Sequence, residues 1–131
     1  MSSSLDKARK KAAKLGITTA QRHIALCCDT REHGCASAQQ MKASWKHLRR
    51  RLKELGLRKP TQVIATQSRC FDICKGGPIA VVYPEAIWYG GCTEKVLDEI
   101  IEEHLVHGRP VAAYVIADSP LLASGTELST D

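Results

Sequence analysis

The sequence has no apolar run that approaches the roughly 20 residues needed for a transmembrane helix. Its first 16 residues carry five Lys and Arg, but they lack the continuous apolar stretch of a secretory signal peptide. We therefore expect a protein that does not span a membrane and that works in the cytoplasm.

The residue patterns of common enzyme active sites are also missing. There is no nucleophile beside a base, no glycine-rich phosphate loop and no pair of carboxylates. The five histidines fall on separate predicted elements without metal-ligand spacing, and His104 is expected on a helix surface or in a dimer contact. These absences argue against catalysis, and we expect that the protein is not an enzyme.

The cysteine content is the most distinctive feature of the composition. At 131 residues, with 44% hydrophobic and 25% charged residues, the chain fits one globular domain with its own core. Cytosolic thiol pools keep cysteines reduced unless they are redox-active or bind a metal. The six cysteines therefore favour a metal site over a disulfide framework.

The net charge of +5 is unevenly distributed along the chain. The segment from residue 42 to residue 59 holds eight Lys and Arg against one Glu. The acidic residues gather in a later predicted helix, at Glu94, Asp98, Glu99, Glu102 and Glu103. A basic helix face is typical of a solvated surface, and it also suits phosphates or acidic proteins. A module that binds nucleic acid or an acidic partner is therefore an alternative function.

Hydrophobic patterning divides the chain into an arm, a domain and a tail. Residues 1–20 show little patterning beyond a short helix over residues 5–15, which predicts a flexible basic arm. The domain is expected over residues 21–117, and residues 118–131 form a C-terminal tail.

The first half of the domain predicts a strand and a helix. The apolar run at residues 23–27 is typical of a buried strand that brings Cys27 to its carboxyl end. Ser37 and Gln40 match a capping box, and an apolar stripe then predicts an amphipathic helix that ends at Gly56. The stripe consists of Met41, Trp45, Leu48, Leu52 and Leu55, with Trp45 interpreted as core filling.

The second half predicts further strands and a last helix. Strands are expected at residues 61–66, 79–83 and 86–89, with a final strand within residues 111–117. Thr93 caps a helix that ends at Gly108. The buried face of this helix is expected to hold Val96, Leu97, Ile100, Ile101 and Leu105. This order predicts an α/β fold, with a hairpin as antiparallel edge strands beside a parallel pair.

Four cysteines follow predicted strands and can form a ligand set. Cys70 and Cys74 form a CxxxC pair after the second strand, and Cys27 and Cys35 flank a loop after the first. Four convergent thiolates fit either a tetrahedral zinc ion or a [2Fe-2S] cluster. The longer spacing of one pair suits a larger inorganic core, and a structural zinc-binding module stays open as an alternative. Thiol–disulfide exchange would need a closer CxxC-like pair.

Three segments of the sequence together form a recognisable pattern. They are the run His-Ile-Ala-Leu-Cys ending at Cys27, the run Cys-Phe-Asp-Ile-Cys at residues 70–74, and the run Gly-Pro-Ile-Ala-Val-Val-Tyr-Pro at residues 77–84. The last run continues through Trp88 and Tyr89 to His104, Leu105 and Gly108. Over about residues 22–112 the chain resembles the thioredoxin-like [2Fe-2S] ferredoxins, found mainly in bacteria and also called Shethna-type ferredoxins.

The resemblance implies a thioredoxin-like mixed sheet flanked by helices, and it implies a homodimer. It also implies a [2Fe-2S] cluster bound by Cys27, Cys35, Cys70 and Cys74, in a one-electron carrier that meets redox partner proteins. The basic surface predicts that these partners present an acidic docking face. Thioredoxin-like folds often place a cis proline where Pro78 stands.

The sequence departs from this family at three places. The first cysteine loop is shorter, the hairpin reads Glu85-Ala86 where the family tends to have Asp-Gly, and Cys28 and Cys92 are additional thiols. In a continuing strand Cys28 would point away from Cys27, which makes Cys27 the preferred ligand. Cys92 is interpreted as a small hydrophobe at a helix entrance.

Overall fold

The structure is a computed structural model of the chain. It describes residues 3–28, 36–69, 71, 73, 75–119 and 127. The helices and strands, in chain order, are α1 (Ser4–Leu15), β1 (Arg22–Cys27), α2 (Ala38–Glu54), β2 (Val63–Ser68), β3 (Ala80–Tyr83), β4 (Ile87–Tyr89), α3 (Glu94–Glu99), the π-helical segment η1 (Ile100–Val106), the 3-10 turn η2 (Ala112–Tyr114) and β5 (Val115–Asp118). In the part of the chain described here, no helix has the length and apolarity needed to cross a bilayer.

The five strands form one mixed sheet in the order β2-β1-β3-β4-β5. β1 runs parallel to β2 and antiparallel to β3, and the remaining neighbours are antiparallel. The predicted α/β class and the parallel pair are therefore confirmed. The β3–β4 hairpin lies inside the sheet, whereas it was expected at the edge, because β5 pairs with β4 and takes the edge position.

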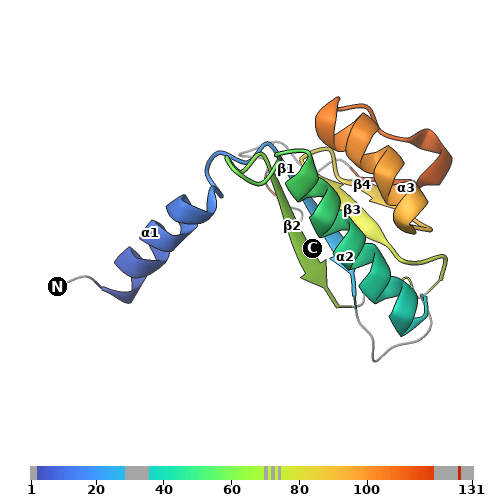
Figure 1. Ribbon diagram of the computed structural model, residues 1–131, viewed down its shortest axis with the longest axis horizontal. Coiled ribbons are helices and arrows are strands. Elements are labelled where there is room, and N and C mark those ends of the chain that lie inside the picture. Colours follow the sequence, from blue (N-terminus) through green and yellow to red (C-terminus); the bar gives the residue numbers. More distant parts are fainter. Residues whose placement is uncertain are drawn as a thin grey trace.

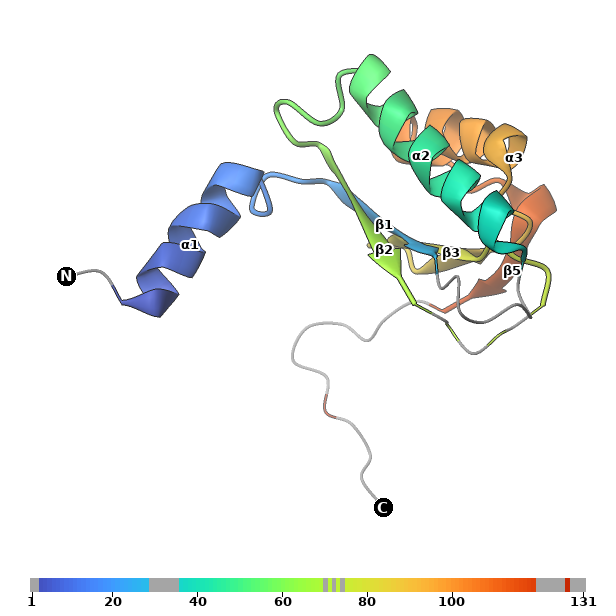
Figure 2. The ribbon, with the colours of Figure 1, turned by 60° about the horizontal axis from the view of Figure 1, so that its bottom comes forward.

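Both helices of the domain, α2 and α3, cover the same face of the sheet (Figures 1 and 2). The main core lies between these two layers. Its fully buried side chains include Ile24, Leu26, Leu48, Leu52, Val82, Tyr89, Leu97 and Ile100. This burial is the main source of stability, because each buried aliphatic side chain contributes about 2 kcal/mol relative to an exposed one.

The predicted helix over the first apolar stripe is confirmed as α2. The Ser37 side chain accepts the N–H of Gln40, but the Gln40 amide does not return to Ser37, so only half of the expected capping box forms. Gln40 instead donates to the hydroxyl of Ser44, which is fully buried. Leu55, predicted in the apolar stripe, is 44% exposed because α2 ends at Glu54.

The last predicted helix is confirmed with its buried face, but its geometry changes along its length. α3 is α-helical from Glu94 and continues from Ile100 as η1 with π-helical bonding. Thr93 occupies the N-cap position without a side-chain hydrogen bond. The five apolar side chains that were expected on one face are all buried, which fixes this helix against the core.

The N-terminal helix α1 projects from the domain (Figures 1 and 2) and buries none of its residues. Its end is fastened to the domain through Thr61, whose hydroxyl donates to the Leu15 carbonyl at 2.9 Å. Gly16 follows with φ 78°, and a side chain there would lie 2.5 Å from the Thr61 side chain. The short helix in the arm is confirmed, and the division into arm, domain and tail stays a prediction.

Candidate metal centre

Cys27 occupies the carboxyl end of β1, as predicted. Its N–H donates to the Ile79 carbonyl at 2.8 Å, and the N–H of Cys28 donates to the Ser68 carbonyl at 2.7 Å. The expected second strand is displaced by two residues to Val63–Ser68, and Cys27 and Ser68 are paired at its end. The carboxyl ends of the parallel strands β1 and β2 therefore lie side by side. The first cysteine loop begins after β1, and the second begins after β2.

Cys27 and Cys28 pack on different clusters, as alternation along a strand requires. Cys27 is 2% exposed and belongs to a small apolar cluster with Met41 and Ile79. Partly buried residues around this cluster are Ala36, Phe71 and Trp88, with the Phe71 and Trp88 rings 5.2 Å apart and edge to face. Cys28 packs instead against the main core.

The residues that pack against the cluster of Cys27 include two from the predicted ligand loops. Ala36 directly follows Cys35 in the sequence, and Phe71 directly follows Cys70. The other three predicted ligands, Cys35, Cys70 and Cys74, lie outside the described residues. Among the described residues, no group of three or more Cys, His, Asp or Glu is placed to hold a metal ion. The described part of the candidate site is therefore Cys27 and its apolar surroundings.

The two additional cysteines have distinct environments. Burial, followed by the charge of Cys27, raises the pKa of the Cys28 thiol to about 11. Cys92 is fully buried in the main core, with its sulfur 3.8 Å from the Tyr89 carbonyl. The interpretation of Cys92 as a small hydrophobe at a helix entrance is confirmed by this packing.

The segment after the second cysteine pair is fastened to the loop between β4 and α3. The N–H of Gly91 donates to the Gly76 carbonyl at 2.6 Å, and that of Cys92 donates to the Pro78 carbonyl at 2.9 Å. Gly90 lies close enough to this segment that a Cβ would stand 3.1 Å from the Gly76 carbonyl. The Gly77–Pro78 peptide is cis, as predicted, and so are the peptides before Pro60 and Pro84.

A buried polar network that includes Glu85 lies at the turn of the β3–β4 hairpin. It shows that the expectation for His104 was wrong. His104 is fully buried, whereas it was expected at a surface or dimer contact. The Val111 N–H donates to the Tyr89 hydroxyl, which donates to His104 Nδ1 at 2.7 Å. His104 Nε2 donates to Glu85 Oε1 at 2.7 Å, and Arg22 Nε donates to the same oxygen at 3.1 Å. One neutral tautomer of His104 satisfies every contact.

Three groups of this network, Glu85, Tyr89 and His104, have shifted pKa values. Burial lowers the pKa of His104 despite its bond to Glu85. For Glu85, burial acts to raise the pKa, but the hydrogen bonds from His104 and Arg22 together hold it below the usual 4.5. Burial also raises the pKa of Tyr89. Glu85 thus supplies the carboxylate that binds His104, and Ala86 has the positive φ of 58° that usually favours glycine.

The free energy of unfolding is expected to decrease as the pH falls below 7. The unfolded chain protonates histidine near 6.5, but folded His104 stays neutral to lower pH, so the unfolded state binds more protons and stability falls. His23, whose pKa is also lowered by burial, acts in the same direction. Glu85 contributes stability above 4.5 that is lost as the pH falls through its lower folded pKa.

Urea denaturation at a series of pH values measures this dependence. His104→Gln removes one titrating group and should flatten the curve between about pH 6.5 and pH 5. His107→Gln changes an exposed histidine on the next turn and should keep the wild-type slope. Equal slopes in the wild type and His104→Gln would contradict the role given to His104.

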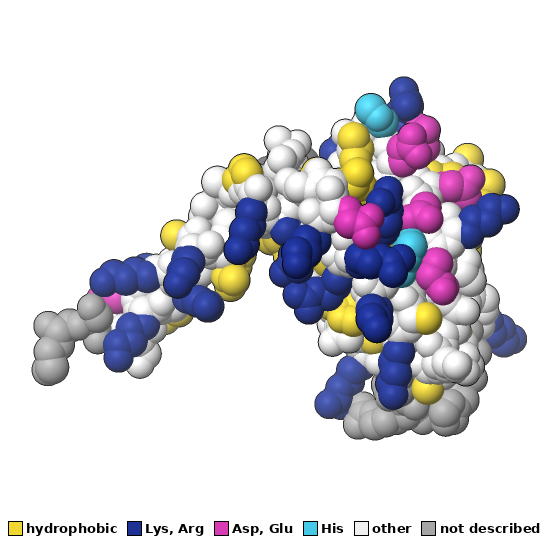
Figure 3. All heavy atoms as spheres, in the orientation of Figure 1, with side chains coloured by type: hydrophobic (Ala, Val, Ile, Leu, Met, Phe, Trp, Pro, Cys, Tyr) yellow, Lys and Arg dark blue, Asp and Glu magenta, His cyan; other side chains and the backbone are white. Residues whose placement is uncertain are grey.

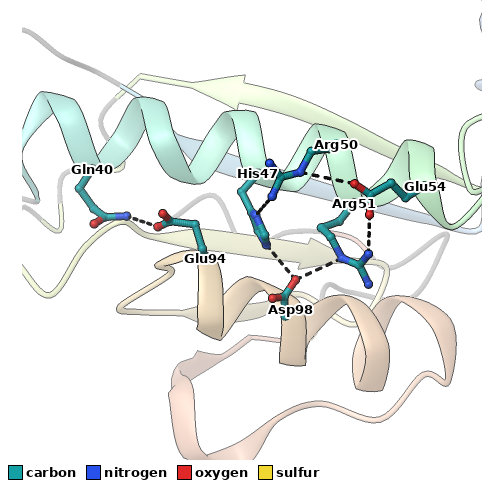
Figure 4. A network of polar contacts seen from close by, with 7 residues as sticks. All are labelled: Gln40, His47, Arg50, Arg51, Glu54, Glu94 and Asp98. Atoms are coloured by element: carbon teal, nitrogen blue, oxygen red, sulfur yellow. Dashed lines mark hydrogen bonds and ion pairs between the residues drawn. The ribbon is translucent and has the colours of Figure 1, made fainter.

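The acidic face of α3 is partly used against α2 (Figure 4). Asp98 accepts from His47 at 2.8 Å and lies 3.3 Å from Arg51 Nε. Glu94 accepts from the Gln40 amide at 2.7 Å. Glu94 and Asp98 stay exposed while they bind α2, so the acids of α3 neutralise one side of the basic helix.

A mixed sheet with two helices on one face, a cysteine at the end of an interior strand and a cis proline before β3 defines a small α/β protein of the thioredoxin-like class. The solved structures agree with this class. The thioredoxin-like [2Fe-2S] ferredoxin from Aquifex aeolicus superposes with a TM-score of 0.67 and 28% identity, covering 76% of this chain and 100% of that one. A second structure of that ferredoxin gives a TM-score of 0.68 over 79% of this chain. The predicted fold class is confirmed.

Sequence similarity leads to the same group of proteins. The chain is 45% identical to a 2Fe-2S ferredoxin of Clostridium pasteurianum over 51 residues. These residues make up 39% of this chain and 50% of that relative. It is 43% identical over 54 residues to a 2Fe-2S ferredoxin of Aquifex aeolicus, 41% of this chain and 49% of that relative. The chain thus matches about half the length of these curated relatives, and no family model matches it. The resemblance stated from the sequence is confirmed.

Proposed function

We propose that the protein binds a [2Fe-2S] cluster through Cys27, Cys35, Cys70 and Cys74 and serves as a one-electron carrier. The observation that carries the proposal is that Ala36 and Phe71, which adjoin two of the other three cysteines in the sequence, pack against the small apolar cluster that contains Cys27. The similarity to named 2Fe-2S ferredoxins supports the choice of this cluster over zinc. The protein then acts as an electron-transfer protein and not as an enzyme.

The surroundings of Cys27 suit a thiolate ligand of a redox centre. Met41, Ile79 and Trp88 exclude water on the protein side of the thiol, and the backbone N–H of Cys27 is already bonded within the sheet. A [2Fe-2S] cluster held at this site would supply one-electron chemistry, and its formal charge would change from −2 to −3 on reduction. Arg69 and Lys75 are exposed beside the second cysteine pair, and their positive charges favour the reduced state.

The partners of this carrier follow from its surface and its fold. Its basic side suits redox partner proteins with an acidic docking face, because complementary charge steers brief encounters. The fold resemblance supports a homodimer, and the compartment in which the cysteines stay reduced is the cytoplasm. Binding of nucleic acid and insertion in a membrane form no part of the proposal.

Absorption and EPR spectroscopy of protein purified without oxygen tests the proposal. Visible absorption bands and an EPR signal after one-electron reduction are expected, since two ferric ions become a mixed-valence pair. Iron and sulfide analysis of the same sample gives the cluster stoichiometry. A colourless protein that contains zinc would replace the carrier by a structural zinc module, because closed-shell Zn²⁺ gives neither signal.

A further inference from the structure

A groove with a basic lining runs along the outer edge of β2. Its volume is about 530 Å³, and it lies between the end of α1, one side of α2 and the strand itself. We define this basic groove by Lys14, Trp45, Arg49, Arg58, Lys59 and residues 63–66. A neighbouring hollow of about 410 Å³ shares Arg58 and Lys59 and adds Lys53. Among the described residues, neither hollow is lined by Asp or Glu.

The cations of the basic groove are available to an external anion. Arg50 and Arg51 on α2 pair with Glu54 or Asp98. By contrast, no carboxylate of a described residue pairs with the groove cations Lys14, Arg49, Arg58 and Lys59. Figure 3 shows Lys and Arg side chains gathered along α1 and over α2 on the same face of the molecule.

The floor of the groove is a strand edge with one neighbour only. Within the described sheet, β2 pairs with β1 and with no other strand. The carbonyls of Gln62 and Ser68 accept from β1-side N–H groups. Because backbone groups of alternate residues point the same way, those of Ala65 and Gln67 point away from β1. An incoming strand could therefore bond to this edge.

The groove wall adds an apolar contact to the strand edge. Trp45, which was expected to fill the core, packs against the main core and is partly buried there. The guanidinium of Arg49 lies over the Trp45 ring, 5.7 Å from its centroid. The guanidinium is thereby held beside the strand edge, where it can meet a carboxylate. Apolar and positively charged groups thus alternate around a strand edge, which suits an extended segment with alternating acidic and apolar side chains.

We propose that the basic groove binds an extended acidic segment of a partner protein, which pairs with β2 as an added strand. Charge complementarity identifies the occupant, since the described residues that line the groove include four cations and no carboxylate. If the proposed function holds, this partner is a redox protein, and that description alone rests on the proposed function. The strand edge leads toward Arg69 and the second cysteine pair, so the docked segment approaches the candidate metal centre.

The probe for this proposal is a blocked synthetic peptide of about eight residues that alternates glutamate with valine. We expect fluorescence anisotropy to show binding at low salt that weakens as salt rises. Reversing two cations together, Arg49→Glu with Lys59→Glu, should weaken binding by about tenfold or more. The matched control Lys95→Glu changes an exposed lysine outside the groove and should bind as the wild type does.

Strand pairing has its own matched variants at Ala65. Proline is tolerated where a strand N–H faces away from its neighbour, but it removes that donor. Ala65→Pro should therefore lose most of the peptide affinity, and Ala65→Val, which keeps the N–H, should retain it. Thermal unfolding checks that both variants fold. Hydrogen exchange of the wild type gives a second measure, in which peptide should protect the amides of Ala65 and Gln67.

Several results would overturn the proposal. Absence of peptide binding at low salt would do so, as would binding without protection of the Ala65 and Gln67 amides. Tighter binding of a short oligothymidylate, with the same loss on charge reversal, would assign the groove to nucleic acid. A change of molecular mass in the charge-reversal variant would assign it to a second copy of the chain. A visible spectrum recorded on the same samples keeps failure of docking separate from failure of the cluster proposal.

Discussion

Replacing Cys27 with alanine is expected to abolish retention of the cluster. Cys27 is held at the end of β1 by a backbone hydrogen bond and a dry apolar cluster, so no other thiol can take its position without moving the strand. With the four-thiolate ligation proposed above, loss of one thiolate would leave an iron with an open ligand position. We expect iron content and visible absorption to fall more than about tenfold, measured in protein purified without oxygen.

Two other cysteines of the same chain provide the matched controls. Cys28→Ala and Cys92→Ala remove thiols that pack on the main core, so both variants should keep the iron content and spectrum of the wild type. A modest loss of stability is expected for Cys92→Ala, because its side chain is fully buried. If Cys28→Ala lost the visible spectrum and Cys27→Ala kept it, Cys28 would be the ligand and Cys27 would not.

The backbone framework around Cys27 could be predicted from the sequence. The apolar run before Cys27 indicated a buried strand, and the structure confirms β1 there. Alternation along that strand also indicated that Cys27 and Cys28 face different sides. Both conclusions depend only on local periodicity, which a sequence shows directly. The segments that carry the other three predicted ligands have no such periodicity, and Cys35, Cys70 and Cys74 themselves lie outside the described residues.

The buried network was harder to predict because its members come from separate elements. His104 joins Tyr89 on β4 to Glu85 in the hairpin, and a sequence does not show which polar groups meet. One signal was available, since His104 stands four residues after Ile100 and seven after Leu97, on the apolar face of its helix. A histidine at such a position is expected to be buried.

The charge pattern of the sequence overstated the free basic surface of the protein, again because a sequence does not show which elements pack together. The sequence shows a basic stretch and a later acidic stretch, but not that α2 and α3 pack side by side. Asp98 binds His47 and Arg51 across this contact, which removes part of the basic surface. Three other cations of the basic segment, Arg49, Arg58 and Lys59, line the basic groove beside β2. The three-dimensional arrangement therefore divides the basic segment into cations that pair with the acids of α3 and cations that line the basic groove.

Replacing His104 with alanine is expected to lower the free energy of unfolding by about 3 kcal/mol. The substitution leaves a cavity where a fully buried ring stood. It also removes the acceptor of the Tyr89 hydroxyl and one of the two donors to Glu85 Oε1, and a buried donor without an acceptor costs about 1–3 kcal/mol. Urea denaturation at pH 7 measures the change. His107→Ala, at an exposed position, should stay within about 0.5 kcal/mol of the wild type.

A double-mutant cycle separates the hydrogen-bond network from the cavity. Tyr89→Phe keeps the ring and removes only the hydroxyl, which should cost about 1–2 kcal/mol, because the Val111 N–H and His104 Nδ1 both lose a partner. In the double variant with His104→Ala the two costs should not add, since the same contact is counted in both. Additive costs would show that His104 stabilises the fold through its volume alone. Non-additive costs would mean that the hydrogen bond to Tyr89 itself fixes helix η1 on the hairpin.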